Sequence, residues 1–337
     1  MKTIPPPWEG RDDAAELAQL QTVRLAHVVP VREPLVLISQ IQRSGGTLLS
    51  QLFDGHPEVH AHPGELHIGP GKAHWPSLDP DAAPDAWFDA LFEQITLEFV
   101  EQGYSKSTPG ARSAGTFDVF PFRFDADRQR AIFLERAEPG SSVRAILDAY
   151  MTSYFNAWLD NANLGTGPKR AVTAFSARLA MNKPDLAAYF RDYPDGTLIT
   201  IVREPRGWFE SSRRYTDRYE DVDRAVATWR RSTRSSLDAR KRYGDRVLIV
   251  SFEDLVRETE PLMRRLADRL GLSFSDELLE PTFNGQPIRA DSSGPVHEHG
   301  VIRERAERPG LDQETERVIA RGTDELYAKA RGFFLGP

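Results

Sequence analysis

The chain has 337 residues, of which 43 are Lys or Arg and 50 are Asp or Glu, so its formal charge is −7 at pH 7. This length suits one large α/β domain with insertions, and the acidic balance argues against general nucleic-acid binding, which needs a basic surface. The absence of cysteine excludes disulfides, thiolate metal sites and thiol nucleophiles. The first residues carry no apolar signal-peptide core, and no stretch reaches about 18 uncharged apolar residues. We therefore expect a cytoplasmic protein without a transmembrane segment.

The first residues of the chain predict an arm, then a buried strand, a turn and a helix. Residues 1–33 are expected to begin as an extended arm because they hold three consecutive prolines. An uninterrupted apolar run predicts a strand at 35–41, and apolar residues at helical spacing predict a helix at 48–53. A turn that contains glycine separates the two, so this segment is a strand–loop–helix unit.

A long segment then separates this unit from the rest of the predicted sheet. The His-, Gly- and Pro-rich stretch 58–80 is expected to be loop. Apolar residues at helical spacing recur at 87–99 and 143–158. We therefore expect 69–168 to be a mainly helical insertion on the substrate side of a single domain that spans 1–337.

The remainder of the chain alternates short strands with helices. Strands are predicted at 171–175, 198–202 and 247–250. Helices are predicted at 184–191, after Pro205, at 222–233, at 262–270 and at 312–330, and loop at 283–310. This alternation predicts an α/β fold of three layers, with a central parallel sheet and right-handed crossovers.

The turn after the first strand is a candidate anion-binding loop. Its sequence is Ser44-Gly45-Gly46-Thr47, preceded by Arg43. Glycine lets several N–H groups converge on an anion at the positive end of a helix dipole, and the Arg and Thr side chains add donors. The triphosphate-binding pattern G-x-x-x-x-G-K-[ST] is not met, because a glycine stands where its Lys would be. The alternative is a simple glycine turn between strand and helix.

A second candidate anion site follows the strand at 198–202. Arg203 stands at its carboxyl end, where parallel sheets bind ligands. Ser211 lies eight residues on, about two turns into the next helix. A guanidinium fork and a hydroxyl bind phosphate well, although Arg203 could instead pair with Glu204 or Asp254. Together the two sites fit a nucleotide with phosphates at both its 5′ and 3′ positions.

These blocks resemble those of the sulfotransferase family, which uses 3′-phosphoadenosine 5′-phosphosulfate (PAPS) as sulfonate donor. The likeness is closest to the bacterial and Golgi branches that include the tyrosylprotein sulfotransferases, and it covers 35–68 and about 170–295. The blocks that carry it are Arg43–Leu49, Leu52–Val59, Val202–Arg206 with Ser211, Tyr243–Leu255 and Phe283–Ser293.

The resemblance implies a P-loop-like phosphosulfate loop that holds the 5′-phosphate and sulfuryl oxygens, with Arg203 and Ser211 on the 3′-phosphate. The residues expected in the loop are Arg43, Ser44, Gly45, Gly46, Thr47 and Leu48. The family usually has Thr where Gly46 stands, so one hydroxyl donor is missing here. The family often carries a Lys or Arg in the segment before the strand that leads to Arg203. Here this segment lacks the usual Lys-x-Pro, and Arg178 is the candidate for the second leaving-group cation.

Sulfonate transfer is an in-line displacement, so the acceptor hydroxyl needs a base and the leaving phosphate needs positive charge. The resemblance assigns the base to Glu65 and a catalytic charge to Arg43. His62 and His67 are the alternative bases. No metal is required, and a metal site in the histidine-rich stretch or at residues 297–299 is the weaker interpretation, because the spacing of the ligands is irregular.

Three functions remain open from the sequence. The first is transfer of sulfonate from PAPS to a hydroxyl or amine of a small-molecule, lipid or glycan acceptor that contacts the insertion at 69–168. The second is a P-loop nucleotide-dependent kinase, and the third is a nucleotide-binding family member without catalysis. A homodimer could form by exchange of the N-terminal arm.

Overall fold

The computed structural model describes residues 22, 27–68, 74–105, 119–290, 298–302 and 310–335. A five-stranded parallel sheet lies at its centre, in the order β2-β3-β1-β4-β5. Its strands are β1 Leu35–Ser39, β2 Val59–Glu65, β3 Ala171–Phe175, β4 Thr197–Val202 and β5 Val247–Ser251. The predicted α/β fold with a central parallel sheet is therefore confirmed.

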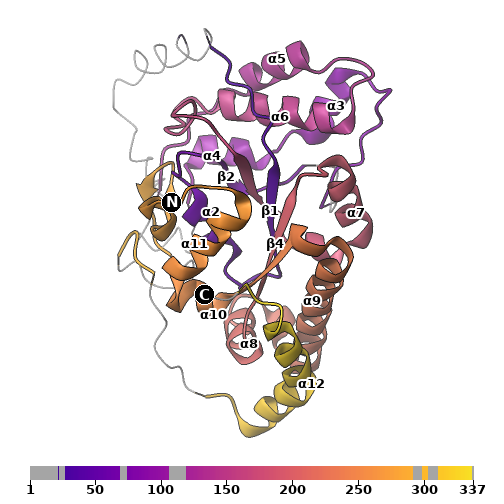
Figure 1. The fold of residues 1–337 in the computed structure, drawn as a ribbon, viewed down its shortest axis with the longest axis vertical. Helices are drawn as coiled ribbons and strands as arrows, with labels where there is room; N and C mark the ends of the chain where they lie inside the picture. The colour runs from indigo at the N-terminus through magenta and orange to yellow at the C-terminus, as the bar shows by residue number, and fades with distance from the viewer. Residues whose placement is uncertain are drawn as a thin grey trace, which may run out of the picture.

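Helices flank the sheet, and Figure 1 shows α2, α10 and α11 on one side of it and α7 and α9 on the other. A short hairpin, β6 Thr282–Phe283 and β7 Gln286–Pro287, lies within the predicted loop. The helices are α2 Gly46–Phe53, α3 Pro84–Leu91, α4 Ile95–Gln102, α5 Ala126–Arg136, α6 Val143–Ala157, α7 Lys183–Asp192, α8 Pro205–Arg213, α9 Val222–Tyr243, α10 Phe252–Arg257, α11 Thr259–Leu270 and α12 Gln313–Arg331.

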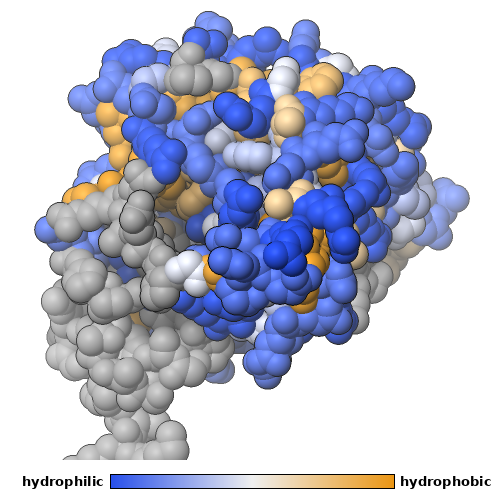
Figure 2. Space-filling view, turned by 90° about the horizontal axis from the view of Figure 1, so that it is seen from below, coloured by the Kyte–Doolittle hydropathy of each residue, from blue (hydrophilic) through white to orange (hydrophobic). Residues whose placement is uncertain are grey.

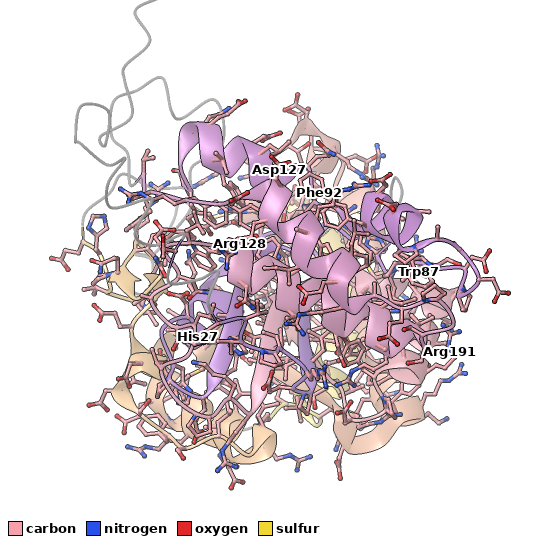
Figure 3. All side chains as sticks on the ribbon, turned by 90° about the horizontal axis from the view of Figure 1, so that it is seen from above. His27, Trp87, Phe92, Asp127, Arg128 and Arg191 are labelled. Atoms are coloured by element: carbon pink, nitrogen blue, oxygen red, sulfur yellow. The ribbon has the colours of Figure 1, made fainter. Side chains whose placement is uncertain are left out.

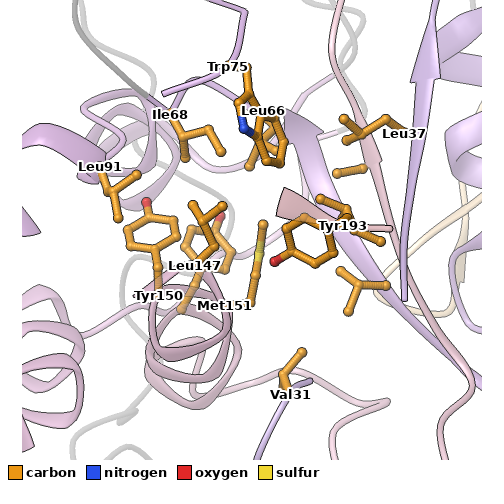
Figure 4. Close-up of a cluster of buried hydrophobic side chains, with 14 of the residues drawn as sticks. Val31, Leu37, Leu66, Ile68, Trp75, Leu91, Leu147, Tyr150, Met151 and Tyr193 are labelled. Carbon is orange, nitrogen blue, oxygen red and sulfur yellow. The ribbon is translucent and has the colours of Figure 1, made fainter. Parts of the chain in front are cut away.

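The central strand β1 feeds two separate hydrophobic cores. Successive side chains of a strand point to opposite faces, so Leu35 and Leu37 join one cluster and Val36 and Ile38 join the other. The first cluster includes Trp75, side chains of α6 and aromatic residues of α7, part of which Figure 4 shows. The second is filled from α2 and α11. Burial on both faces explains why β1 is an uninterrupted apolar run.

A third cluster fastens the C-terminal helix to the sheet. Trp208 of α8, Trp229 of α9 and Ile319 of α12 are all buried in it. The Trp229 indole N–H donates to the Arg203 carbonyl at 2.9 Å. The packing of α8, α9 and α12 therefore fixes the backbone at the end of β4.

The prediction that 58–80 is loop is wrong at its beginning, because 59–65 form the edge strand β2. Pro63 and Gly64 gave the stretch the composition of a loop. An edge strand tolerates proline, since one of its sides needs no hydrogen-bond donor. The pairing of β2 with β3 shifts register between Ala61 and Glu65, which accommodates the two residues.

The described part of 69–168 contains α3 to α6, seen from above in Figure 3. Helix α5 was not predicted because nearly half of its residues are charged and its apolar residues are few. Asp125 caps its start, and its carboxylate accepts from the Arg128 N–H at 2.9 Å. Of the predicted arm, 1–21 and 23–26 lie outside the described residues. Its last residues run along α6, where Val31 N–H donates to Thr152 Oγ1 at 2.9 Å.

The described surface is largely hydrophilic on the side of α8 and α12, with smaller hydrophobic patches between the hydrophilic residues (Figure 2). Among the helices that the structure describes, none is both long and apolar enough to cross a membrane.

Candidate active site

The five parallel strands bring the candidate residues to one edge of the sheet. All carboxyl ends of a parallel sheet face the same way, and ligands bind in the crevice beyond them. Each strand contributes a residue there: Arg43 follows β1, Glu65 ends β2, Arg178 follows β3, Arg203 follows β4 and Phe252 follows β5. Residues that are far apart in the sequence are therefore neighbours in the fold.

The predicted anion loop leads directly into α2. Arg43 and Gly45 both have positive φ, 67° and 95°, and Gly46 is the first helical residue. No side chain among the described residues caps this helix end. The first N–H groups of a helix have no partner within it, so those of the loop remain able to bind an anion.

The side chains of this loop differ in what they can offer a ligand. Ser44 is buried, and Thr47 is partly exposed. Leu48 lies in the core on the α2 side of the sheet, so only its backbone N–H can face the loop.

Phe252 packs beneath the loop. A Cβ atom on Gly45 would lie 2.5 Å from Cδ2 of the Phe252 ring, so only glycine fits at this position. The Arg203 guanidinium stands over the same ring, 4.2 Å from its centroid. One aromatic side chain therefore holds both the loop and the second candidate anion site in place.

The two candidate anion sites are joined by direct hydrogen bonds. Arg43 Nε donates to Ser211 Oγ at 3.1 Å, and Arg203 Nη1 donates to the Arg43 carbonyl at 2.8 Å. Glu204, a partner that the sequence suggested for Arg203, caps α8 and accepts from the Gly207 N–H at 2.7 Å. Arg43, Arg203 and Ser211 thus form one cluster, which joins the predicted loop to the predicted site at Arg203 and Ser211 by direct contacts.

Arg178 lies against the same loop. Its N–H donates to the Gln40 carbonyl at 3.0 Å, and its Nη2 donates to Gln42 Oε1 at 2.6 Å. Gln42 is itself fixed, because its carbonyl accepts from the Trp208 indole at 2.9 Å. The guanidinium adds a third positive charge to this edge of the sheet.

Glu65 presents a partly exposed carboxylate at the end of β2. Its side chain is 37% exposed. Its Oε1 accepts from the Ala177 N–H at 3.3 Å, and its Oε2 lies 3.9 Å from His67 Nε2. Ala177 immediately precedes Arg178, so the carboxylate and this cation belong to adjoining segments.

His62 lies inside the protein rather than on this edge. Its two ring nitrogens lie 3.3 Å from the Gly64 carbonyl and 3.1 Å from Glu93 Oε1. Glu93 also accepts from the His67 N–H at 2.9 Å and from the Tyr150 hydroxyl at 3.1 Å. Sequence reasoning missed Glu93, because nothing in its local pattern distinguishes it from a surface acid.

The charge of Glu93 is stabilised by these contacts. Burial acts to raise its pKa, but attraction to His62 and hydrogen bonds from His62, His67 and Tyr150 outweigh it, so the pKa is lowered. By contrast, burial and nearby Lys169 lower the pKa of His60 to about 3. Among the described residues no group of three or more His, Cys, Asp or Glu could hold a metal ion, and His297 lies outside them.

A parallel sheet with a glycine loop, arginines and a hydroxyl at its carboxyl edge is typical of domains that bind phosphate-bearing nucleotides. The chain belongs to the sulfotransferase family, whose model matches residues 34–276. No curated protein matches it.

Several solved structures are similar to the chain. The sulfotransferase domain of the Synechococcus PCC 7002 olefin synthase is 24% identical, with a TM-score of 0.47, over 87% of this chain and 95% of that one. The sulfotransferase domain from the curacin biosynthetic pathway is 18% identical, with a TM-score of 0.43, over 86% and 97%. A sulfotransferase from Alicyclobacillus acidocaldarius is 16% identical, with a TM-score of 0.41, over 89% and 97%. The chain is assigned to the family by the match of the family model over residues 34–276, and not by these structures.

Replacing Gly45 by Ala will destabilise the protein by about 2 kcal/mol or more, because it adds a clash with Phe252 to the cost of a positive φ. Chemical denaturation measures the change. Gly140→Ala is the matched control, since its φ is also positive at 79° but no described atom lies within 4 Å of the added Cβ. Equal losses in the two variants would show that Phe252 does not restrict residue 45.

Replacing Glu93 by Gln will cost about 2 kcal/mol of unfolding free energy at pH 7, because charged hydrogen bonds in the interior become neutral ones. The lowered pKa means that this stabilisation is present above the ordinary value of 4.5 and is lost as the pH falls through the folded-state value. Urea denaturation between pH 7 and pH 3 will therefore show the wild-type advantage shrinking. Glu260→Gln, at an exposed ion pair with Arg264, should change stability little at any pH. A loss of unfolding free energy in Glu93→Gln that stays the same from pH 7 to pH 3 would contradict the lowered pKa of Glu93.

Proposed function

We propose that this protein transfers a sulfonate group from PAPS to a hydroxyl or amine of a small-molecule, lipid or glycan acceptor. The observation that carries the proposal is the cluster of Arg43, Ser211 and Arg203, in which the loop and the second anion site share hydrogen bonds. A ligand that contacts both sites needs two anionic groups, and a nucleoside with 5′ and 3′ phosphates has them. Membership of the sulfotransferase family supports the choice of a sulfonate donor.

The residues present fit such a donor. Guanidinium groups, a hydroxyl and the open N-terminus of a helix are the groups with which proteins bind phosphate and sulfate oxygens. The N–H groups of Gly46 and Thr47, with Arg43, would hold the 5′-phosphosulfate, and Arg203 and Ser211 would hold the 3′-phosphate. When bound, the donor supplies an activated sulfonate group.

The reaction asks two things of the chain's own residues. Glu65 is proposed to take the proton of the acceptor hydroxyl, because it is a partly exposed carboxylate with one oxygen held by the Ala177 N–H. Arg43 and Arg178 are proposed to stabilise the negative charge that develops on the leaving phosphate. His67 remains the alternative base. His62, whose imidazole contacts Glu93, is better placed to support the segment that carries Glu65.

The proposal is tested by calorimetric titration with 3′-phosphoadenosine 5′-phosphate, AMP and ATP, each with and without Mg²⁺. The bisphosphate is expected to bind at least about tenfold more tightly than AMP without Mg²⁺, since charge-assisted hydrogen bonds contribute about 1.5–3 kcal/mol. Ser211→Ala should reduce this preference about threefold to tenfold. Ser212→Ala is the matched control, because Ser212 is the next residue of α8 and is fully buried. Tighter binding of ATP with Mg²⁺ would favour the kinase function instead. If none of the three nucleotides binds, the glycine loop is only a structural turn.

Replacing Glu65 by Gln is expected to lower turnover about 100-fold or more while leaving the affinity for the bisphosphate unchanged, because a general base contributes about 10²–10⁴ to the rate. Turnover is measured as release of 3′-phosphoadenosine 5′-phosphate from PAPS with a panel of phenols and aliphatic alcohols. His67→Gln is the comparison variant and should retain most activity. A larger loss of turnover in His67→Gln than in Glu65→Gln would make His67 the base.

A further inference from the structure

The start of α2 has a space that another residue fills. A Cβ atom on Gly46 would lie 2.0 Å from Nε2 of Gln40 and 2.4 Å from its Cδ and Oε1. The Gln40 carboxamide therefore occupies the position that a side chain on residue 46 would take. Only one of the two residues can have a side chain there, so Gln40 and Gly46 form a unit.

The Gln40 side chain is buried beside the loop without being fully paired. Gln40 is 5% exposed, and among the described residues its Oε1 has no hydrogen-bond partner. Its backbone is fixed, because its carbonyl accepts from the Arg178 N–H at 3.0 Å. A buried amide oxygen without a donor is costly, so the orientation of this amide is not fixed by partners within the described part of the protein. Its nitrogen is the amide atom nearest to the Cβ position of Gly46, at the open end of α2. An N–H donor at that place suits an anionic ligand.

We propose that Gln40 is a donor-binding residue, whose amide N–H donates to an oxygen of the 5′-phosphosulfate held at the start of α2. The inference rests on the proposed function and names a further residue of the same site. The amide nitrogen already lies at the start of α2, where the positive end of the helix favours an anion. Gln40 thereby supplies the side-chain donor that Gly46 cannot.

The alternative is that Gln40 only fills space, and two substitutions separate the cases. Gln40→Met keeps the volume but removes the N–H, and Gln40→Glu keeps the shape but adds a negative charge. Calorimetry with 3′-phosphoadenosine 5′-phosphate should show affinity reduced about tenfold by Met and at least a hundredfold by Glu. Adenosine 3′-phosphate, which lacks the 5′ group, should be affected less than threefold by Met.

Gln51→Met is the matched control, because Gln51 is also buried but lies further along α2, near Tyr104. It should leave the affinity for both nucleotides unchanged. Thermal melts of each variant establish that it is folded. Unchanged affinity in Gln40→Met would overturn the proposal, as would an equal loss for both nucleotides.

An exchange of the two residues tests the unit directly. Gly46→Thr alone should weaken bisphosphate binding, because its side chain collides with Gln40. The double variant Gln40→Gly with Gly46→Thr should recover to within about threefold of the wild type, since the threonine hydroxyl then takes the vacated space. A double variant no better than Gly46→Thr would contradict the inference. If the wild type itself does not prefer the bisphosphate to AMP, the proposed function fails; if it does, only the role of Gln40 is in question.

Discussion

The candidate site depends on Arg43 more than on any other residue. Its carbonyl accepts from Arg203 and its guanidinium donates to Ser211, so it connects the end of β1 to the end of β4 and to α8. Its φ of 67° turns the chain from the strand into the loop. A left-handed arginine is strained, and such strain persists where surrounding contacts determine the backbone. Here those contacts are the same ones that join the two candidate anion sites.

Much of the fold could be predicted because its signals are local. The apolar runs of β1, β4 and β5 reflect burial on both faces of a parallel sheet, which composition alone reveals. The edge strand β2 was missed because Pro63 and Gly64 conceal it, and its role depends on pairing with β3, about 110 residues later in the chain. Helix α5 was missed because its charged sequence shows little apolar periodicity.

The candidate site was predictable in its parts but not in its connections. Strand ends and glycine placed the loop and Arg203, because the carboxyl edge of a parallel sheet follows from topology. Gln40 and Glu93 could not be found this way, since their roles depend on which buried atoms they meet in three dimensions. In the sequence, Gly46 indicates only that a hydroxyl donor is missing. The structure shows that the Gln40 side chain occupies the space of a side chain on residue 46.

The protein carries a net negative charge, whereas its candidate site gathers arginines. The chain carries −7 overall, yet Arg43, Arg178 and Arg203 gather beside the open end of α2. Surface charges beyond a Debye length of about 8 Å are largely screened at physiological ionic strength, so the acidic remainder repels a bound anion only weakly. The nearby arginines and N–H groups act at hydrogen-bond distance and are screened much less. The selectivity for a doubly anionic nucleotide that we propose would therefore come from this local cluster, and the acidic surface elsewhere would reduce binding of other polyanions without weakening the candidate site.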